Sequence, residues 1–200
     1  EKLEQKWTKY PILHLDLNIE KYDTIDSLHH ILDLNLSNWE KLYGSYEKEK
    51  SFSLRFAGII QRAYEKTGER VVILVDEYDK PMLQAINDEE LTDEYRKTLK
   101  AFYSVLKTQD MYIKFAFLTG VTKFGKVSVF SDLNNLSDIS MDEEYIDICG
   151  ITEQELHTYF DEDVARLGEK YKLSKDDCYA KLQKQYDGYH FEANTIGLYN

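Results

Sequence analysis

Cysteine is scarce in this chain, and the two that occur, Cys149 and Cys178, are far apart with no Cys-x-x-Cys motif. This spacing argues against a disulfide framework and against a zinc site of the usual ligand pattern. The chain also lacks a hydrophobic run long enough to cross a bilayer, and it shows no N-terminal signal peptide. We therefore expect a cytoplasmic protein with no membrane partner.

Positive charge is in deficit, since 25 Lys and Arg stand against 37 Asp and Glu, for a formal net charge of −12. Proteins that grip a nucleic-acid backbone need clustered basic side chains, and no such run occurs here. Direct nucleic-acid binding by this acidic chain is not expected. Hydrophobic residues make up 42% of the 200 residues, with 16 Tyr and 9 Phe, which is enough for an aromatic core.

One phosphate-binding motif is incomplete in this sequence, and one metal-binding motif is absent. Residues 120–126 match the first seven places of the phosphate-binding loop G-x-x-x-x-G-K-[ST], but Val127 stands where the hydroxyl ligand for Mg²⁺ belongs. We interpret the match as accidental, although Lys123 and Lys126 remain candidates to face a bound phosphate. The metal-binding pattern of restriction endonucleases, an Asp followed by Asp/Glu-x-Lys, is also absent.

The most informative stretch is 71–75, five consecutive apolar residues that run directly into Asp76 and Glu77. Such a run predicts an interior strand of a parallel sheet covered on both faces. Open α/β sheets bind ligands at the C-terminal ends of their strands, where the two carboxylates fall. In a Walker B element the first acid helps to hold Mg²⁺ and nucleotide, and the second orients or deprotonates the attacking water. The alternative is a buried strand that ends in a solvated acidic turn.

The rest of the chain alternates strand and helix patterns. Further strands are predicted at residues 11–17, 112–118 and 145–149, and helices at 51–67 and 92–107. A capping box from Thr152 to Glu155 predicts a helix that buries Leu156, Tyr159, Phe160, Val164 and Leu167, and another helix starts near residue 174. This order predicts an α/β core over residues 1–150 and an α-helical portion over residues 151–200.

Thr119 ends the strand predicted at 112–118, which places its hydroxyl at the same sheet edge as Asp76 and Glu77. A polar side chain there can hydrogen-bond the attacking water or the γ-phosphate, as the sensor residue of many NTPases does. The alternative is a threonine that simply closes a strand.

Several blocks of the sequence resemble the bacterial AAA-ATPase-like family. They are Leu-Val-Asp-Glu-Tyr-Asp-Lys-Pro at 74–81, Phe-Tyr-Ser-Val-Leu-Lys at 102–107, Leu-Thr-Gly-Val-Thr-Lys-Phe at 118–124, Phe-Ser-Asp-Leu-Asn-Asn-Leu at 130–136, Cys-Gly-Ile-Thr-Glu at 149–153 and Tyr-Asp-Gly-Tyr-His-Phe at 186–191. The resemblance covers residues 10–200. Members of this family, frequent in gut Bacteroidetes, are similar to P-loop ATPases and often carry a restriction-endonuclease-like domain after the ATPase region.

The resemblance implies a P-loop NTPase-like, three-layer parallel sheet followed by an α-helical lid portion. The family's first strand and its Walker A loop would precede residue 1, so we expect a fragment of a longer protein that lacks the Walker A part. In an AAA-type sheet that strand would lie between the strands predicted at 112–118 and 145–149.

The resemblance also implies the roles of the site residues. Asp76 would be the Mg²⁺-side acid, Glu77 the water-activating acid and Thr119 the sensor, with ATP and Mg²⁺ as cofactors in the full-length protein. Arg96 and Arg166 are candidates for an arginine finger. Nucleotide is the implied partner, a nuclease-like domain could follow in the parent chain, and oligomerisation is compatible with the family.

Three hypotheses follow for the function. The first is the Walker B and sensor portion of a cytoplasmic ATPase, in which ATP hydrolysis acts as a conformational switch and the segment alone hydrolyses ATP poorly. The second is an interaction module whose fold survives without nucleotide chemistry. The third is a metal-dependent phosphodiesterase that uses Asp76, Glu77 and Asp79.

Overall fold

The structure is a computed structural model that describes residues 7–121, 129, 135–145, 147–186 and 197–199. The chain divides into two compact units, Glu1–Leu136 and Ser137–Asn200, and each is considered by itself. The predicted boundary, after residue 150, lies inside the second unit. Within the described ranges, no helix combines the length and the hydrophobicity needed to cross a bilayer.

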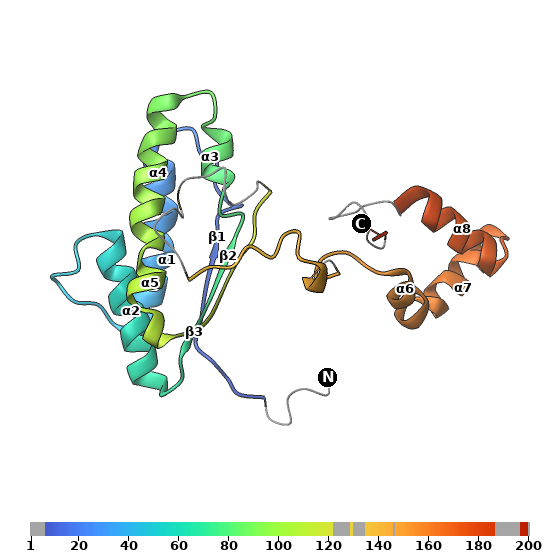
Figure 1. Ribbon diagram of the computed structural model, residues 1–200, viewed down its shortest axis with the longest axis horizontal. Helices are drawn as coiled ribbons and strands as arrows, with labels where there is room; N and C mark the ends of the chain where they lie inside the picture. The colour runs from blue at the N-terminus through green and yellow to red at the C-terminus, as the bar shows by residue number, and fades with distance from the viewer. Residues whose placement is uncertain (1–6, 122–128, 130–134, 146, 187–196, 200) are drawn as a thin grey trace. The chain divides into compact units, whose positions relative to one another are not determined.

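A parallel sheet forms one layer of the first unit (Figure 1). Its strands are β1 (Ile12–Asp16), β2 (Val71–Asp76) and β3 (Ile113–Leu118), in the order β1-β2-β3. β2 pairs with both neighbours, and a register shift between Val71 and Val72 interrupts its ladder with β3. The α/β class and the parallel sheet predicted from the sequence are confirmed.

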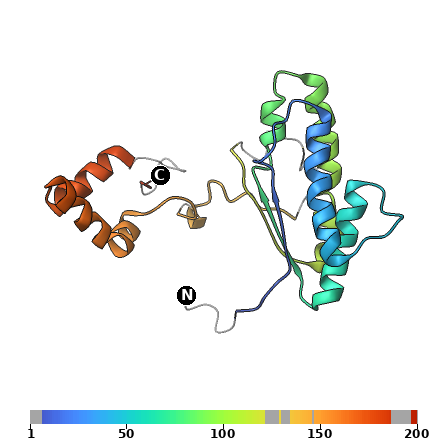
Figure 2. The same ribbon diagram turned by 180° about the vertical axis from the view of Figure 1, so that it is seen from behind.

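Helices fill the connections between the strands. They are α1 (Ile25–Tyr43), α2 (Phe52–Thr67), α3 (Lys80–Gln84), α4 (Glu89–Tyr103), α5 (Val105–Thr108) and the 3₁₀ helix η1 (Asp110–Tyr112). The predicted helix 92–107 is thus two helices, α4 and α5, separated at Ser104. Figures 1 and 2, from opposite sides, show α1, α2, α4 and α5 together on one face of the sheet.

Burial alternates along the strands, and this alternation defines the covered face. Val71, Ile73 and Val75 of β2 are almost fully buried against the helices, whereas Val72 and Leu74 between them are only half-buried. On the opposite face Ile12 is 56% exposed and Phe115 is 53% exposed. The described helices of this unit therefore cover one face of the sheet, where the apolar run at 71–75 predicted cover on both.

Local signals in the sequence set both ends of α2. The Ser51 hydroxyl accepts the Leu54 N–H at 3.2 Å, which satisfies one of the free donors of the first turn. Gly68 ends the helix in the left-handed conformation at φ 73°, which glycine adopts without steric cost. Arg62 then fastens α2 to the preceding loop, with its Nη1 2.6 Å from Glu49 Oε1.

The second unit is helical and contains η4 (Glu143–Tyr145), α6 (Glu153–Tyr159), α7 (Asp161–Tyr171) and α8 (Lys175–Tyr186). The capping box is confirmed, because the Thr152 hydroxyl accepts the Glu155 N–H at 3.1 Å and the Thr152 N–H donates to Glu155 Oε2 at 3.0 Å. The helical portion predicted to follow the α/β core is therefore present.

The fourth strand predicted at 145–149 is wrong. A 3₁₀ helix ends at Tyr145, and the described residues from 147 to 149 form a turn and bends. Tyr145 is 40% exposed and Ile148 is 53% exposed, so neither occupies an interior sheet position. A short apolar run does not by itself distinguish a strand from other conformations, and here no neighbouring strand pairs with it in the described part of the chain.

The burial predicted after the capping box is also partly wrong. Leu156 and Val164 are buried, but Tyr159 is 73% exposed, Phe160 is 40% exposed and Leu167 is 37% exposed. The single predicted helix is broken at Phe160, whose backbone leaves the helical region at φ −116° and ψ 8°. The prediction assumed one continuous helix, and the 3.6-residue periodicity does not extend across this break.

Stacked aromatic rings connect the helical layer, and they provide a test of its core. Phe56 of α2 stacks on Phe102 of α4 with ring centroids 4.5 Å apart. Phe56→Ala should lower the free energy of unfolding by about 3–5 kcal/mol, because it removes a buried ring and leaves a cavity. Leu54→Ala, at a 55% exposed position of the same helix, is the matched control and should change it by less than about 0.5 kcal/mol. Urea denaturation followed by circular dichroism measures both, and similar losses for the two variants would contradict this core.

Candidate functional site

Three polar side chains lie at the C-terminal ends of the three strands, at one edge of the sheet. β1 ends at Asp16, β2 ends at Asp76, and Thr119 comes directly after β3. The register pairs Asp16 with Asp76, as expected where parallel strands end together. Thr119 donates a hydrogen bond from its hydroxyl to Asp76 Oδ1. Two of the residues singled out in the sequence are therefore in direct contact.

Backbone hydrogen bonds extend the sheet ladder past β3 and fix Thr119 in this position. The Thr119 N–H donates to Val75 O at 2.9 Å, and the Tyr78 N–H donates to Thr119 O at 2.9 Å. Thr119 is thus held between the end of β2 and the turn that follows it. These bonds fix the Thr119 backbone, from which the side-chain rotamer directs the hydroxyl to Asp76.

Glu77 occupies an unusual backbone conformation. Its φ is 55°, in the left-handed region that side chains with a Cβ rarely adopt. This residue turns the chain out of β2, and its carbonyl accepts the Lys80 N–H at 3.0 Å as α3 begins. Such strained residues concentrate at functional sites, where the surrounding structure holds them. The second predicted catalytic acid is therefore half-buried in a tight turn directly beside Asp76.

Asp79 lies differently from the other two acids. Its side chain is fully buried, and the Val121 N–H lies 3.2 Å from its Oδ1 and 3.1 Å from its Oδ2. The sequence suggested Asp79 as a third metal ligand in the phosphodiesterase hypothesis. Its burial sets it apart from Asp76, which is exposed at the sheet edge.

The exposed carboxylate of Asp76 fits a magnesium ion that is bound together with phosphates. Mg²⁺ in such sites takes one or two carboxylates, and water and phosphate oxygens supply its other ligands. Asp16, half-buried and in register with Asp76, brings a second carboxylate to the same edge. No group of three or more His, Cys, Asp or Glu that could hold a metal ion occurs in the described part of the chain.

The remaining predicted residues are not brought to this edge by any described contact. Lys123 and Lys126 lie outside the described residues. Arg96 of α4 pairs with Asp93, and Arg166 of α7 pairs with Asp163 at 2.5 Å, so each forms an ion pair three residues away on its own helix. Their suggested role as an arginine finger stays a prediction.

Sequence reasoning missed Asp16 and its neighbour Asn18. Lys80, at the start of α3, donates through Nζ to Asn18 O at 2.7 Å and also contacts the Asn18 side chain. This ties the loop after β1 to the turn after β2. Asp16 could have been found from its place near the C-terminal end of the strand predicted at 11–17, since the C-terminal ends of parallel strands lie at the same edge of a sheet as Asp76.

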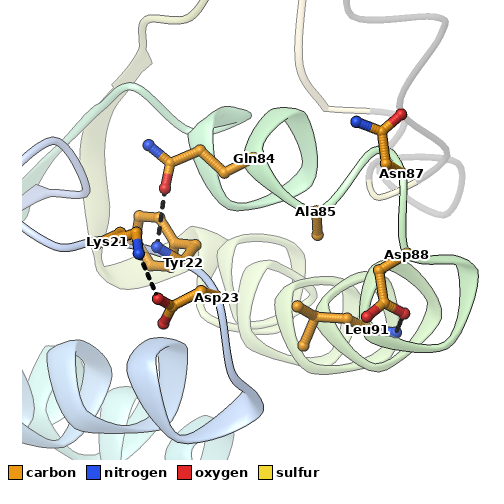
Figure 3. A pocket seen from close by; sticks show the side chains of 8 residues that line it. All are labelled: Lys21, Tyr22, Asp23, Gln84, Ala85, Asn87, Asp88 and Leu91. Carbon is orange, nitrogen blue, oxygen red and sulfur yellow. Dashed lines mark hydrogen bonds and ion pairs between the residues drawn. The ribbon is translucent and has the colours of Figure 1, made fainter.

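A pocket of about 440 Å³ opens between the loop after β1 and the junction of α3 and α4 (Figure 3). It is lined by Lys21, Tyr22, Asp23, Gln84, Ala85, Asn87, Asp88 and Leu91. Most of its polar groups already serve the fold: Lys21 pairs with Asp23 at 2.6 Å, and Gln84 Oε1 accepts the Tyr22 N–H at 2.8 Å. We therefore assign no ligand to this pocket.

The conformation of Glu77 predicts an inverted preference between glycine and alanine. Both Glu77→Gly and Glu77→Ala remove the carboxylate, but only glycine relieves the left-handed strain. The glycine variant should therefore be more stable than the alanine variant by about 1 kcal/mol. At Glu90, an exposed helical position of α4, the order should reverse by about 1 kcal/mol. Thermal unfolding of the four variants measures both differences. A more stable alanine variant at both positions would contradict the left-handed conformation of Glu77.

Comparison with known proteins identifies the family of this chain. A family described as AAA-ATPase-like, "Predicted AAA-ATPase", matches residues 1–130. A relative described as "Uncharacterized protein in vnfD 5'region", from Azotobacter chroococcum mcd 1, is 41% identical over 142 residues, which are 71% of this chain and 26% of that protein. The chain thus spans about a quarter of the relative's length, and no solved structure matches significantly. Because the family match extends over more than half of the chain and includes all three strands with their acidic edge, this protein belongs to the AAA-ATPase-like family.

Proposed function

We propose that the first unit is the Walker B and sensor portion of an ATPase that binds ATP with Mg²⁺ and hydrolyses it. The observation that carries this proposal is the hydrogen bond between Thr119 and Asp76 at the C-terminal edge of a parallel sheet, with Glu77 next in the chain. This edge is where open α/β sheets bind their ligands. The family membership supports an ATPase-type function.

The three side chains divide the chemistry among them. Asp76 would hold the magnesium ion that accompanies the nucleotide. Glu77 would orient or deprotonate the attacking water. The Thr119 hydroxyl would accept a hydrogen bond from that water while it donates to Asp76, or would donate to the γ-phosphate after giving up its bond to Asp76. The magnesium ion, when bound, neutralises the charge that develops on the phosphate oxygens.

The phosphate-binding loop of this site would come from outside the 200 residues. β3 has β2 as its neighbour on one side only among the described strands, so its other edge can accept the strand that carries such a loop. A strand at that edge would place its own C-terminal end beside Thr119 and Asp76. Lys123 and Lys126, which follow β3 in the sequence, are proposed to contact phosphate from the adjacent loop.

Hydrolysis in the full-length protein would serve as a conformational switch. We propose that the helical second unit begins the lid, and that the protein is cytoplasmic. An attached nuclease-like domain would be the element that the switch controls. The phosphodiesterase hypothesis is weaker, because it requires Asp79 as a ligand and that side chain is buried.

The direct test is Glu77→Gln in the full-length protein. The amide keeps the shape of the side chain but cannot accept the proton of the attacking water, so ATP turnover should fall by about 10²–10⁴-fold. Binding of Mg²⁺–ATP, measured by fluorescence titration, should stay within a few-fold of the unmodified protein. Glu90→Gln, on the exposed first turn of α4, is the control and should leave turnover unchanged.

Two results would count against the proposal. One is ATP turnover in Glu77→Gln equal to that of the control variant. The other is turnover well above background by residues 1–200 alone, since this segment carries no complete phosphate-binding loop. A full-length protein that binds no nucleotide would instead support the interaction-module hypothesis.

A further inference from the structure

A buried carboxylate joins the turn after β2 to the turn after β3. Asp79 is fully buried, yet it belongs to the acidic turn that contains Asp76 and Glu77. Its oxygens lie 3.1 and 3.2 Å from the Val121 N–H, and Val121 itself is 76% exposed. An acid is rarely taken out of water unless its hydrogen bonds are satisfied inside the protein. The contact with Val121 therefore identifies the first residues after β3 as one of the elements that this acid fixes.

Gly120 makes the close approach of the two turns feasible. A Cβ atom at this position would lie 2.6 Å from Asp79 Oδ1 and 2.6 Å from the Tyr78 ring, well inside van der Waals contact. The Tyr78 side chain is also almost fully buried, so it has little room to move away. The glycine is thus required by contact with two side chains of the opposite turn.

We propose that Asp79 is a positioning residue for the sensor, and this inference rests on the ATPase function proposed above. Asp79 holds Val121, and Tyr78 holds the Thr119 carbonyl through its own N–H at 2.9 Å. The chain between these two attachments cannot shift without breaking one of them. Thr119 is therefore kept within hydrogen-bond reach of Asp76 by the same turn that supplies Glu77.

The described part of the segment after β3 ends at Val121, the residue that the Asp79 side chain holds through its N–H. In this role Asp79 acts through the backbone, and it is neither a metal ligand nor a residue that touches the reacting atoms.

The test compares two substitutions of Asp79 in the full-length protein. Asp79→Asn keeps a side-chain oxygen that accepts the Val121 N–H, whereas Asp79→Leu fills the space and removes the acceptor. A hydrogen bond to a charged group contributes about 1.5–3 kcal/mol, so amide exchange at residues 119–121 should rise by about 10–100-fold in the leucine variant. The asparagine variant should retain most of the protection.

Steady-state kinetics provide the second readout. In Asp79→Leu, kcat for ATP should fall by about tenfold or more while KM changes by less than about threefold, because the sensor loses its position and the nucleotide keeps its contacts. Asp79→Asn should restore kcat to within about threefold of the unmodified protein. Asp26→Asn, an exposed acid in the first turn of α1, is the control and should change neither measurement.

If Asp79→Leu does not fold, Gly120→Ala examines the same contact. Its methyl group must displace Asp79 or Tyr78, so exchange at residues 119–121 should again increase. Unchanged exchange in the variant that folds, or equal loss of kcat in the asparagine and leucine variants, would overturn the proposal. Loss of Mg²⁺ binding in Asp79→Asn would overturn it as well, since that result makes Asp79 a ligand. The exchange measurement needs no ATP hydrolysis, so it tests the role of Asp79 even if the ATPase function fails.

Discussion

The hydrogen bond between Thr119 and Asp76 is the interaction on which the rest of the site depends. It exists because β2 and β3 are parallel and end at the same edge, so that a residue after one strand meets the last residue of the other. An antiparallel pairing would have placed these two side chains at opposite ends of the sheet. The helices on the covered face, anchored by residues such as Phe56 and Phe102, hold the strands in this register.

The turn after β2 contains two residues whose conformation or burial is unfavourable in free energy. Glu77 adopts a left-handed backbone, and Asp79 places a carboxylate in the interior. Both are unfavourable in isolation, and both are offset because the turn is bonded to the segment after β3. Each of these two acids therefore has its own structural role in the turn: Glu77 turns the chain out of β2, and Asp79 attaches the turn to the segment after β3.

The sequence predicted the parts of the fold that depend on local pattern. The strand at 71–75, the Ser51 cap with Gly68, and the capping box at Thr152 appear as expected, because each signal lies within one element. The cover predicted on both faces of that strand depends on other elements, and the described helices cover only one face. The failures involve long-range pairing or the assumption of one continuous helix. The strand predicted at 145–149 has no neighbour to pair with in the described residues, and the helix predicted after the capping box is divided at Phe160, with Tyr159 exposed. Asp16 and the buried role of Asp79 were missed because both depend on which strands become neighbours.

The central claim is that Mg²⁺ and ATP bind at the sheet edge formed by Asp76, Glu77 and Thr119. An experimental structure of the full-length protein with Mg²⁺ and a non-hydrolysable ATP analogue tests it most directly. The metal ion should lie within coordination or one-water distance of the Asp76 carboxylate, with the γ-phosphate beside Thr119 and Glu77, and with Asp79 buried away from the metal. A nucleotide bound at another edge of the sheet, or a metal ion coordinated by Asp79, would contradict the account.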